Sequence, residues 1–491
     1  MLHQLPPELL ECVYARLDVF DLCALATLNR HLHFTALHHL FSRYSVFDPV
    51  RLSVTFPRTL TLSPKESFAV IQALMMALSF PFPPKLLECT VENPFPRVCK
   101  DLVKIRRLIE KVNSIEAVEF HFLLYEDFER HRRRFPKRRT SIITLVRDLL
   151  DVVAFKSPCR KVTLVGAVVL PHADPFRDIH GKYPRLNNLV GFGRRFLFPN
   201  SLSNDVSKQS NLRVLNIHGS LSFHRTIAEW TFKLLTSPSV EVLSLRDTEL
   251  GYYLWETILP RIYLPNLKEL YLNNTMVDRT HITTFLTRHP SLVRLDLGFS
   301  GTTMDPTWPS PPRHLLPNVT WLEGDPRFLG FFLHSHTSLP KVRELVINII
   351  VPNIILFKYL SRALPHVEPR LRQLNVTLQL SLHGGPGSIN LPWTQSDEEI
   401  PSCCDHIKKL VILTFYRRLM KDDGEVEGFL VWMKRFKEVE CIAFEECHKE
   451  VWNGAVMKRL ARGLMKRESE LKVRTLQLND EAKPLEEWSE S

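Results

Sequence analysis

Four histidines within nine residues, His31, His33, His38 and His39, form the densest group of chemically versatile side chains in the chain. Clustered imidazoles suit metal binding. A zinc site, however, also needs cysteine pairs or carboxylates at defined spacing, and the surrounding residues provide none. We therefore predict no metal site, and expect these histidines to lie on a helix surface or at an interface.

The nine cysteines also lack a spacing that would support chemistry. Cys441 and Cys447 are six positions apart and Cys403 adjoins Cys404, whereas zinc knuckles and redox pairs have two intervening residues. An odd number of irregularly spaced cysteines is typical of an intracellular protein with reduced thiols. We expect mostly buried, reduced thiols.

Enzyme signatures are missing from the sequence. Gly191-Phe192-Gly193 is an isolated fragment, and the glycine-rich residues 384–387 have no lysine to reach a phosphate. The sequence has no nucleophile elbow and no paired-histidine zinc helix. We therefore predict a protein without catalytic activity and without a cofactor.

Length and composition indicate a folded chain. Its 491 residues allow about three domains or one long repeat array, and 44% hydrophobic with 24% charged residues are ordinary globular values. The formal net charge of +11 modestly favours acidic partners. Glu8 and Glu11 interrupt any signal peptide, and the longest apolar stretch, residues 68–80, is shorter than the ~20 residues of a membrane span. We expect an intracellular protein of the cytoplasm, the nucleus or both.

The most basic segment is residues 130–139, which contains seven arginine or lysine residues around Phe135 and Pro136. Clustered basic residues suit a nuclear import signal, an acidic-peptide contact or an RNA contact. A solvated loop is the simplest interpretation, because so basic a segment is unsuited to a core. An RNA or DNA contact would involve Arg132, Arg133 and Arg134 and would weaken steeply with salt.

Internal repeats give the strongest signal in the sequence. The pattern leucine-x-x-leucine-x-leucine starts at Leu212, Val240, Leu267 and Leu292, at intervals of 28, 27 and 25 residues, which is typical of leucine-rich repeats. The same pattern continues on both sides, with starts at Leu86, Ile115, Cys159, Val342, Leu371, Ile407, Val439 and Val473 and degenerate copies at Leu186 and Val319.

Each repeat predicts one strand and one return helix. After the strand near Leu272, Ile282, Phe285 and Leu286 share a helix face, and Pro290 ends that helix before the next strand. Ile227, Trp230 and Leu234 have the same spacing one repeat earlier. The predicted fold is α/β, a leucine-rich-repeat solenoid over residues 86–480 with parallel strands on the concave face and helices outside.

The first 45 residues have a different, helical pattern. Pro6 and Pro7 suit a helix start, and either Asp18 or Asp21 suits the cap of a second helix. A segment of ~40 residues this rich in leucine is too small to enclose its own core, so it requires a partner surface.

This segment resembles an F-box. The resemblance rests on Leu5-Pro6-Pro7-Glu8-Leu9-Leu10, on Leu17-Asp18 with Asp21-Leu22, and on residues 28–32. Asn29 stands where cysteine is frequent and Leu32 where tryptophan is frequent, although leucine there is similar to many fungal-type members. With the repeats that follow, the chain resembles the F-box leucine-rich-repeat proteins over nearly its whole length. The implied organisation is an F-box at 1–45, a helical linker or cap at 46–85, the solenoid, and an acidic tail at 481–491. We expect this tail to be disordered, the alternative being a latch across the repeats.

The resemblance implies a function. The chain would be the substrate receptor of a Skp-cullin-F-box ubiquitin ligase, with the F-box on the Skp-type adaptor and the repeats on a protein substrate marked for degradation. The alternatives are a Skp-bound scaffold outside any ligase and, less favoured, a nucleic-acid-associated repeat protein. The adaptor-binding candidates, which would form either the interface itself or the core that supports it, are Leu5, Pro6, Leu9, Leu10, Val13, Leu17, Leu22, Leu25, Leu28 and Leu32.

A substrate surface is expected on the strand positions that flank the buried leucines. These positions mix both charge signs with amides, which favours a protein partner over a nucleic acid. The candidates are Asn216, His218, Ser244, Arg246, Glu269, Tyr271, Asn273, Arg294 and Asp296.

Overall fold

A computed structural model of the chain defines two compact units, residues 1–266 and 267–491. The residues it describes are 5–28, 30–43, 51–55, 86–92, 97–111, 115–123, 136–166, 210–223, 225–248, 252–273, 279–298, 311–335, 337–350, 368–382, 402–414, 423–445, 454–479 and 481–490, with the single positions 250, 277, 360 and 364. The predicted repeat at Leu186 and the first half of the basic run lie outside these residues.

The first unit begins with three helices and continues with parallel strands in chain order. Its helices are α1 (Pro7–Arg16), α2 (Val19–Ala26), α3 (Arg30–Arg43), α5 (Arg97–Lys111), α7 (Pro136–Phe155), α10 (Arg225–Leu234) and α11 (Tyr252–Ile258), with 3-10 turns at Leu221–Phe223 and Leu259–Arg261. Its strands are β1 (Arg51–Thr55), β2 (Leu86–Glu92), β3 (Ala117–Leu123), β4 (Lys161–Gly166), β5 (Val214–His218) and β6 (Val242–Arg246).

The second unit repeats the same alternation. Its strands are β7 (Glu269–Asn273), β8 (Arg294–Asp296), β9 (Trp321–Gly324), β10 (Glu344–Ile350), β11 (Asn375–Leu382), β12 (Ile407–Thr414), β13 (Cys441–Glu445), β14 (Thr475–Leu478) and β15 (Glu481–Pro484). Its helices are α12 (Arg279–Thr287), α13 (Pro326–Leu333), α15 (Glu368–Leu371), α16 (Asp423–Met433), α17 (Gly454–Met465) and α18 (Leu485–Glu490), with a 3-10 turn at Ser402–His406. Within the second unit, neighbouring strands from β7 to β14 pair in parallel, and β15 pairs antiparallel with β14.

The strand pairing places the repeated apolar residues in continuous buried rows. In the first unit Leu87, Val118, Val162, Leu215 and Leu243 align across five strands, and all are fully buried. In the second unit the corresponding row is Leu270, Leu295, Leu322 and Leu345. The mixed α/β class and the parallel strands predicted from the sequence are confirmed.

Three strand pairings have a different register from the one that the pattern predicts. Cys89 pairs with Phe120 rather than Val118, and Leu345 pairs with Val376 rather than Leu374, which are displacements of two residues. Leu410 pairs with Leu378 rather than Leu374, a displacement of four residues beside an irregularity in β11. A displacement by an even number of residues keeps the same side chains on the buried face, so alternation in the sequence does not distinguish these registers.

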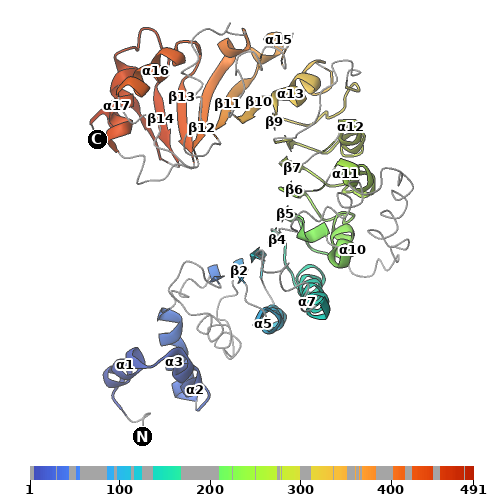
Figure 1. Cartoon of the computed structure of the whole chain (residues 1–491), viewed down its shortest axis with the longest axis vertical. Coiled ribbons are helices and arrows are strands. Elements are labelled where there is room, and N and C mark those ends of the chain that lie inside the picture. The colour runs from blue at the N-terminus through green and yellow to red at the C-terminus, as the bar shows by residue number, and fades with distance from the viewer. Residues whose placement is uncertain are drawn as a thin grey trace. The chain divides into compact units, whose positions relative to one another are not determined.

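Helices cover one side of the strands in both units. Figure 1 shows α5 beside β2, with α7, α10 and α11 on one side of β4–β6, and α12 and α13 on one side of β7–β9. The expected apolar faces are confirmed, because Ile227, Trp230 and Leu234 of α10 are buried. Ile282, Phe285 and Leu286 of α12 are buried in the same way.

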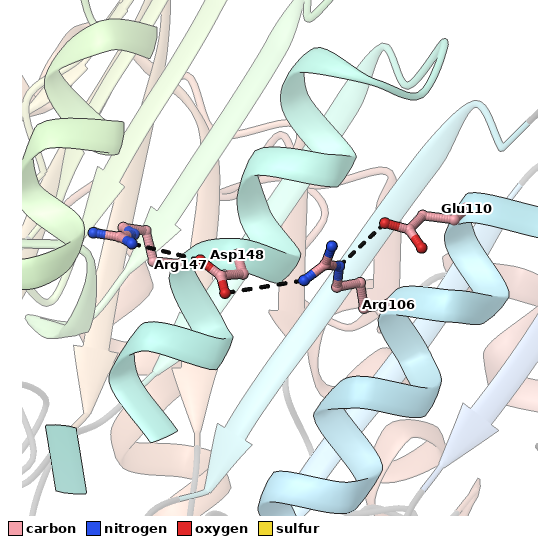
Figure 2. A network of polar contacts seen from close by, with 4 residues as sticks. All are labelled: Arg106, Glu110, Arg147 and Asp148. Atoms are coloured by element: carbon pink, nitrogen blue, oxygen red, sulfur yellow. Dashed lines mark hydrogen bonds and ion pairs between the residues drawn. The ribbon is translucent and has the colours of Figure 1, made fainter. Parts of the chain in front are cut away.

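Helices α5 and α7 are also joined at their surface by a small polar network (Figure 2). The Arg106 guanidinium lies 3.1 Å from the Glu110 carboxylate on its own helix and 3.9 Å from Asp148 on α7. Asp148 is also 3.5 Å from Arg147. These side chains are all about one third exposed, so the network adds little to stability and mainly fixes the pairing of the two helices.

Three expectations need correction. The described part of the predicted helical linker, Arg51–Thr55, is strand β1 and pairs with β2. The second half of the basic run is the first turn of α7, which starts at Pro136 because proline suits the first position of a helix. The acidic C-terminal segment is ordered: it forms β15 and α18, and Leu485 and Trp488 are buried.

None of the helices in the described ranges combines the length and the apolar character that a membrane crossing requires.

Candidate functional site

The N-terminal helices are defined by local features of the sequence. Helix α1 starts at Pro7 after Pro6, as the proline pair predicts. Asp18, rather than Asp21, caps α2, because its side chain accepts a 2.8 Å hydrogen bond from the Asp21 amide. The Arg43 guanidinium at the end of α3 donates to the Leu17 carbonyl at the end of α1, at 2.7 Å.

A compact core holds these three helices together. Leu10, Leu22 and Leu32 are buried, although they were among the predicted adaptor contacts. They pack with Tyr14, Val19, Ala36, Leu37 and Leu40, which the sequence prediction of the site had omitted. The Tyr14 hydroxyl lies 2.9 Å from the Thr35 hydroxyl, which links α1 to α3. Leu10, Leu22 and Leu32 therefore support the surface rather than form it.

Other predicted contacts remain on the surface. Leu5, Leu9 and Leu28 are 37%, 52% and 66% exposed. Pro6 is exposed as well, and Val13, Leu17 and Leu25 are half-buried. Only seven large apolar side chains are exposed among all described residues, and three of them lie in this short segment. Such a concentration of solvated leucines indicates a protein contact.

A cysteine lies within this helical segment but is not reactive. Cys23 is buried on α2, and burial, assisted by the negative charge of Asp18, raises the pKa of its thiol to about 11. At neutral pH it is protonated and acts as a small apolar side chain.

The strand face of the first unit carries the predicted residues Asn216, His218, Ser244 and Arg246. The Asn216 amide donates to the Thr163 hydroxyl on β4 at 3.1 Å. His218 pairs in register with Arg246, and its pKa is lowered by burial and then by the Arg246 charge. Ser244 is buried, with no hydrogen-bond partner for its hydroxyl among the described residues.

The second unit brings together the other five predicted residues. The Tyr271 hydroxyl donates to the Glu269 carboxylate at 2.6 Å. Burial, followed by this hydrogen bond, raises the pKa of Tyr271 to about 12. The Asn273 amide donates to the Asp296 carboxylate at 3.0 Å. The Arg294 guanidinium lies 5.4 Å from the centre of the Tyr271 ring.

Gly298 makes the Asn273–Asp296 contact possible. Its φ of 31° is in the left-handed region, and a side chain at this position would collide with Asn273. Its backbone N–H donates to the second Asp296 oxygen at 2.8 Å. Asp296 is therefore buried but hydrogen-bonded through both oxygens, and it positions Asn273 instead of facing solvent.

The sequence prediction did not include several neighbours of these residues. Trp321 on β9 stacks under the Arg294 guanidinium at 3.7 Å, and Glu323 accepts a 2.6 Å hydrogen bond from Asn348 on β10. In the first unit Glu119 and His121 on β3 contact each other at 2.8 Å. They occupy the same alternate strand positions as the predicted residues, so extending the pattern to every repeat would have found them.

These two strand faces mix donors, acceptors and aromatic rings, which suits recognition of a polypeptide. Asn216, Asn273 and Asp296 are held by hydrogen bonds to neighbouring strands, so these side chains have little rotamer freedom left to lose on binding.

Comparison with protein families identifies one domain. Residues 2–54 match the F-box domain, which confirms the F-box predicted at the N-terminal end of the sequence. F-box domains bind Skp-type adaptors of Skp-cullin-F-box ubiquitin ligases. No curated protein matches the chain.

Proposed function

We propose that this protein is a substrate receptor of a Skp-cullin-F-box ubiquitin ligase. The observation that carries the proposal is the F-box match at residues 2–54, together with the exposed leucines Leu5, Leu9 and Leu28 in the same segment. The F-box would bind a Skp-type adaptor, and the parallel strands would hold a protein substrate for ubiquitination.

We further propose that the strand–helix units are leucine-rich repeats. Support comes from the buried apolar rows, in which residues such as Leu270, Leu295 and Leu322 occupy equivalent positions on successive strands. Side chains also join successive strand–helix segments in the same way. The Asn266 amide donates to the Pro238 carbonyl, and the Asn318 amide donates to the Pro290 carbonyl. Both bridges span 28 residues.

In this proposal the chain performs no chemistry and works inside the cell. Binding of the F-box to the adaptor would hold a captured substrate at a fixed distance from the ubiquitin-carrying enzyme, which raises the effective concentration of the reacting groups. Degradation of the substrate would follow from its modification.

The docking surface is tested with the full-length double variant Leu9→Ala/Leu28→Ala, in a pull-down against a purified Skp-type adaptor. Each leucine contributes about 1.5 kcal/mol or more when buried at an interface, so the pair should weaken binding by about a hundredfold. Both side chains are exposed in the free protein, so circular dichroism should not change.

The matched control is Val431→Ala/Met465→Ala, which trims two exposed apolar side chains on α16 and α17. This control should bind the adaptor like the unmodified chain. Equal adaptor affinity of the Leu9/Leu28 variant and the unmodified chain would reject the docking surface. If a cullin does not co-purify with the adaptor-bound protein, the chain is an adaptor-bound scaffold outside the ligase.

A further inference from the structure

Two aromatic rings hold the Arg294 guanidinium on the strand face of the second unit. Arg294 on β8 is in register with Trp321 on β9, and its guanidinium carbon lies 3.7 Å from the centre of the Trp321 ring. The same carbon lies 5.4 Å from the centre of the Tyr271 ring, which comes from β7. A guanidinium over an aromatic face is attracted by the ring, so the two rings orient it without hydrogen bonds.

The hydrogen-bond donors of this guanidinium have no partner. The Arg294 side chain forms no hydrogen bond and no ion pair with any residue that the structure describes. Its Nε atom is buried without an acceptor, whereas its two terminal nitrogens are not buried. The Trp321 ring covers one face of the guanidinium, but the N–H groups lie in the plane and point away from the ring. The terminal edge is therefore an oriented fork of donors without an acceptor.

The carboxylates nearest in the strand register are held by other donors. Glu269, in register with Arg294, accepts from the Tyr271 hydroxyl at 2.6 Å. Asp296, two residues along β8, is buried and accepts from the Asn273 amide at 3.0 Å. Arg294 is thus a charged donor on this face that is available to an acceptor from another molecule.

The surrounding charges limit which acceptor suits this fork. The two oxygens of a carboxylate match a guanidinium fork and accept two parallel hydrogen bonds. Glu269 and Asp296 lie beside Arg294, and Glu344 lies in the same row on β10. These negative charges repel a segment that carries several acidic residues. One carboxylate between uncharged residues gains the paired hydrogen bonds with the least repulsion.

We propose that Arg294 binds the carboxylate of a single aspartate or glutamate, placed between uncharged residues, in the protein substrate. The inference rests on the proposed receptor function. Arg294 determines specificity, while Trp321 and Tyr271 position its guanidinium before the substrate arrives. A side chain that is already oriented loses little rotamer freedom on binding. Arginine, tryptophan and tyrosine are also the residue types that most often dominate interface affinity.

The test begins with a library of random dodecapeptides displayed on phage and selected on the immobilised full-length protein. The peptides are joined to the coat protein through their C-termini, so any selected carboxylate belongs to a side chain. We expect an aspartate or glutamate at a shared position among peptides selected on the unmodified chain, and loss of these peptides when the selection uses Arg294→Met. Methionine keeps an unbranched apolar side chain beside Trp321, so circular dichroism should not change.

One selected peptide is then labelled with fluorescein, and fluorescence anisotropy measures its affinity in a double-mutant cycle. Replacement of its acidic residue by the matching amide should weaken binding to the unmodified chain by about tenfold or more, as expected for a hydrogen bond to a charged group. The same replacement should have almost no effect on Arg294→Met, because the partner is already absent. Arg294→Lys keeps the charge but loses the fork, so it should recover only part of the affinity.

The matched control is Arg474→Met, which removes an exposed arginine just before β14. It makes the same change of net charge and should stay within about twofold of the unmodified chain. An equal loss of affinity in Arg474→Met and Arg294→Met would overturn the inference, since it would show an effect of net charge alone.

Other results would also overturn the inference. One is a selection without a shared acidic position, and another is an amide replacement that costs as much on Arg294→Met as on the unmodified chain. Tighter binding of a phosphoserine peptide than of the acidic peptide would assign the fork to a phosphate group instead. If Arg294→Met fails to fold, unchanged affinity both for Arg294→Lys and for the amide peptide on the unmodified chain would refute the carboxylate contact.

An adaptor pull-down with Arg294→Met separates this inference from the proposed function. The substitution lies outside residues 2–54, so the variant should retain the adaptor. A chain that selects acidic peptides through Arg294 but never binds an adaptor would refute the receptor function and leave a peptide-binding site. Adaptor binding without selection of an acidic position would refute the role of Arg294 and leave the receptor function in place.

Discussion

At the scale of single residues, the N-terminal helices contain leucines of two kinds. Leu22 is fully buried in the three-helix core, whereas Leu28 is 66% exposed just after α2. The same substitution to alanine should therefore have different effects at the two positions. Leu22→Ala should lower the free energy of unfolding by about 2–5 kcal/mol, because it leaves a cavity, whereas Leu28→Ala should change it by less than about 0.5 kcal/mol.

Chemical denaturation of the full chain, followed by circular dichroism with each variant against the unmodified protein, measures this difference. Adaptor affinity is the second measurement. Leu28→Ala should weaken adaptor binding while leaving the fold intact. A Leu28→Ala variant as unstable as Leu22→Ala would mean that Leu28 is part of the core and not of the docking surface.

The sequence identified which residues belong to these helices but not which side each one faces. Apolar side chains occur on both the core face and the exposed face, so a periodic pattern predicts the helix without separating Leu10, which is buried, from Leu9, which is exposed. Tyr14 was overlooked for a related reason. Its burial depends on a hydroxyl partner, Thr35, that lies 21 residues away in the sequence.

At the scale of secondary-structure elements, the C-terminal segment closes the edge of the last parallel strand. Strand β15 pairs antiparallel with β14, and α18 follows directly. Trp488 anchors α18: it is 4% exposed, and its indole N–H donates to the Leu476 carbonyl on β14 at 3.0 Å. The Lys483 ammonium lies 4.8 Å from the centre of the same ring.

Trp488→Ala should release this segment, because a large buried side chain and a hydrogen bond are lost together. The freed edge of β14 would then expose unpaired backbone groups that promote association between chains. We expect greater self-association in light scattering and faster amide exchange in β14 and β15. Trp488→Phe keeps most of the apolar volume and should show a much smaller change; monomeric behaviour of Trp488→Ala would show that β14 needs no cover.

Composition suggested a disordered tail here because six of the last eleven residues are acidic or serine. Leu485 and Trp488 are three positions apart, so they lie on the same face of α18, and both are buried. The leucine pattern was a better guide for the parallel strands, since each predicted set within the described ranges contributes at least one residue to a strand, although Leu371 ends helix α15 and Leu374 precedes β11. Its remaining error was in register, because β2 with β3 and β10 with β11 pair two residues away from the predicted alignment, and β11 with β12 pairs four residues away.

At the scale of the whole molecule, the pairings in each unit join elements that are close in the sequence. Strand β13 pairs with its sequence neighbours β12 and β14, and helix α16 contacts α17. In such an arrangement stability is approximately a sum of terms for each repeat and for its nearest neighbours. A defect in one repeat should therefore reduce stability locally, and its effect should decrease along the chain.

Ile442→Ala tests this property, because Ile442 is fully buried on β13 between Leu410 and Leu476. The loss of a buried isoleucine costs about 2–5 kcal/mol. Hydrogen exchange should become faster in β12–β14 and remain unchanged in β2–β4. Leu87→Ala is the reciprocal variant, since Leu87 is equally buried on β2, and its effect should be confined to the first unit.

Loss of protection in both units after either substitution would mean that the chain unfolds as one cooperative body. Confinement would mean instead that the strands can differ in stability from repeat to repeat, so that a partner bound to one group of strands would stabilise those strands and their immediate neighbours without changing the stability of the F-box.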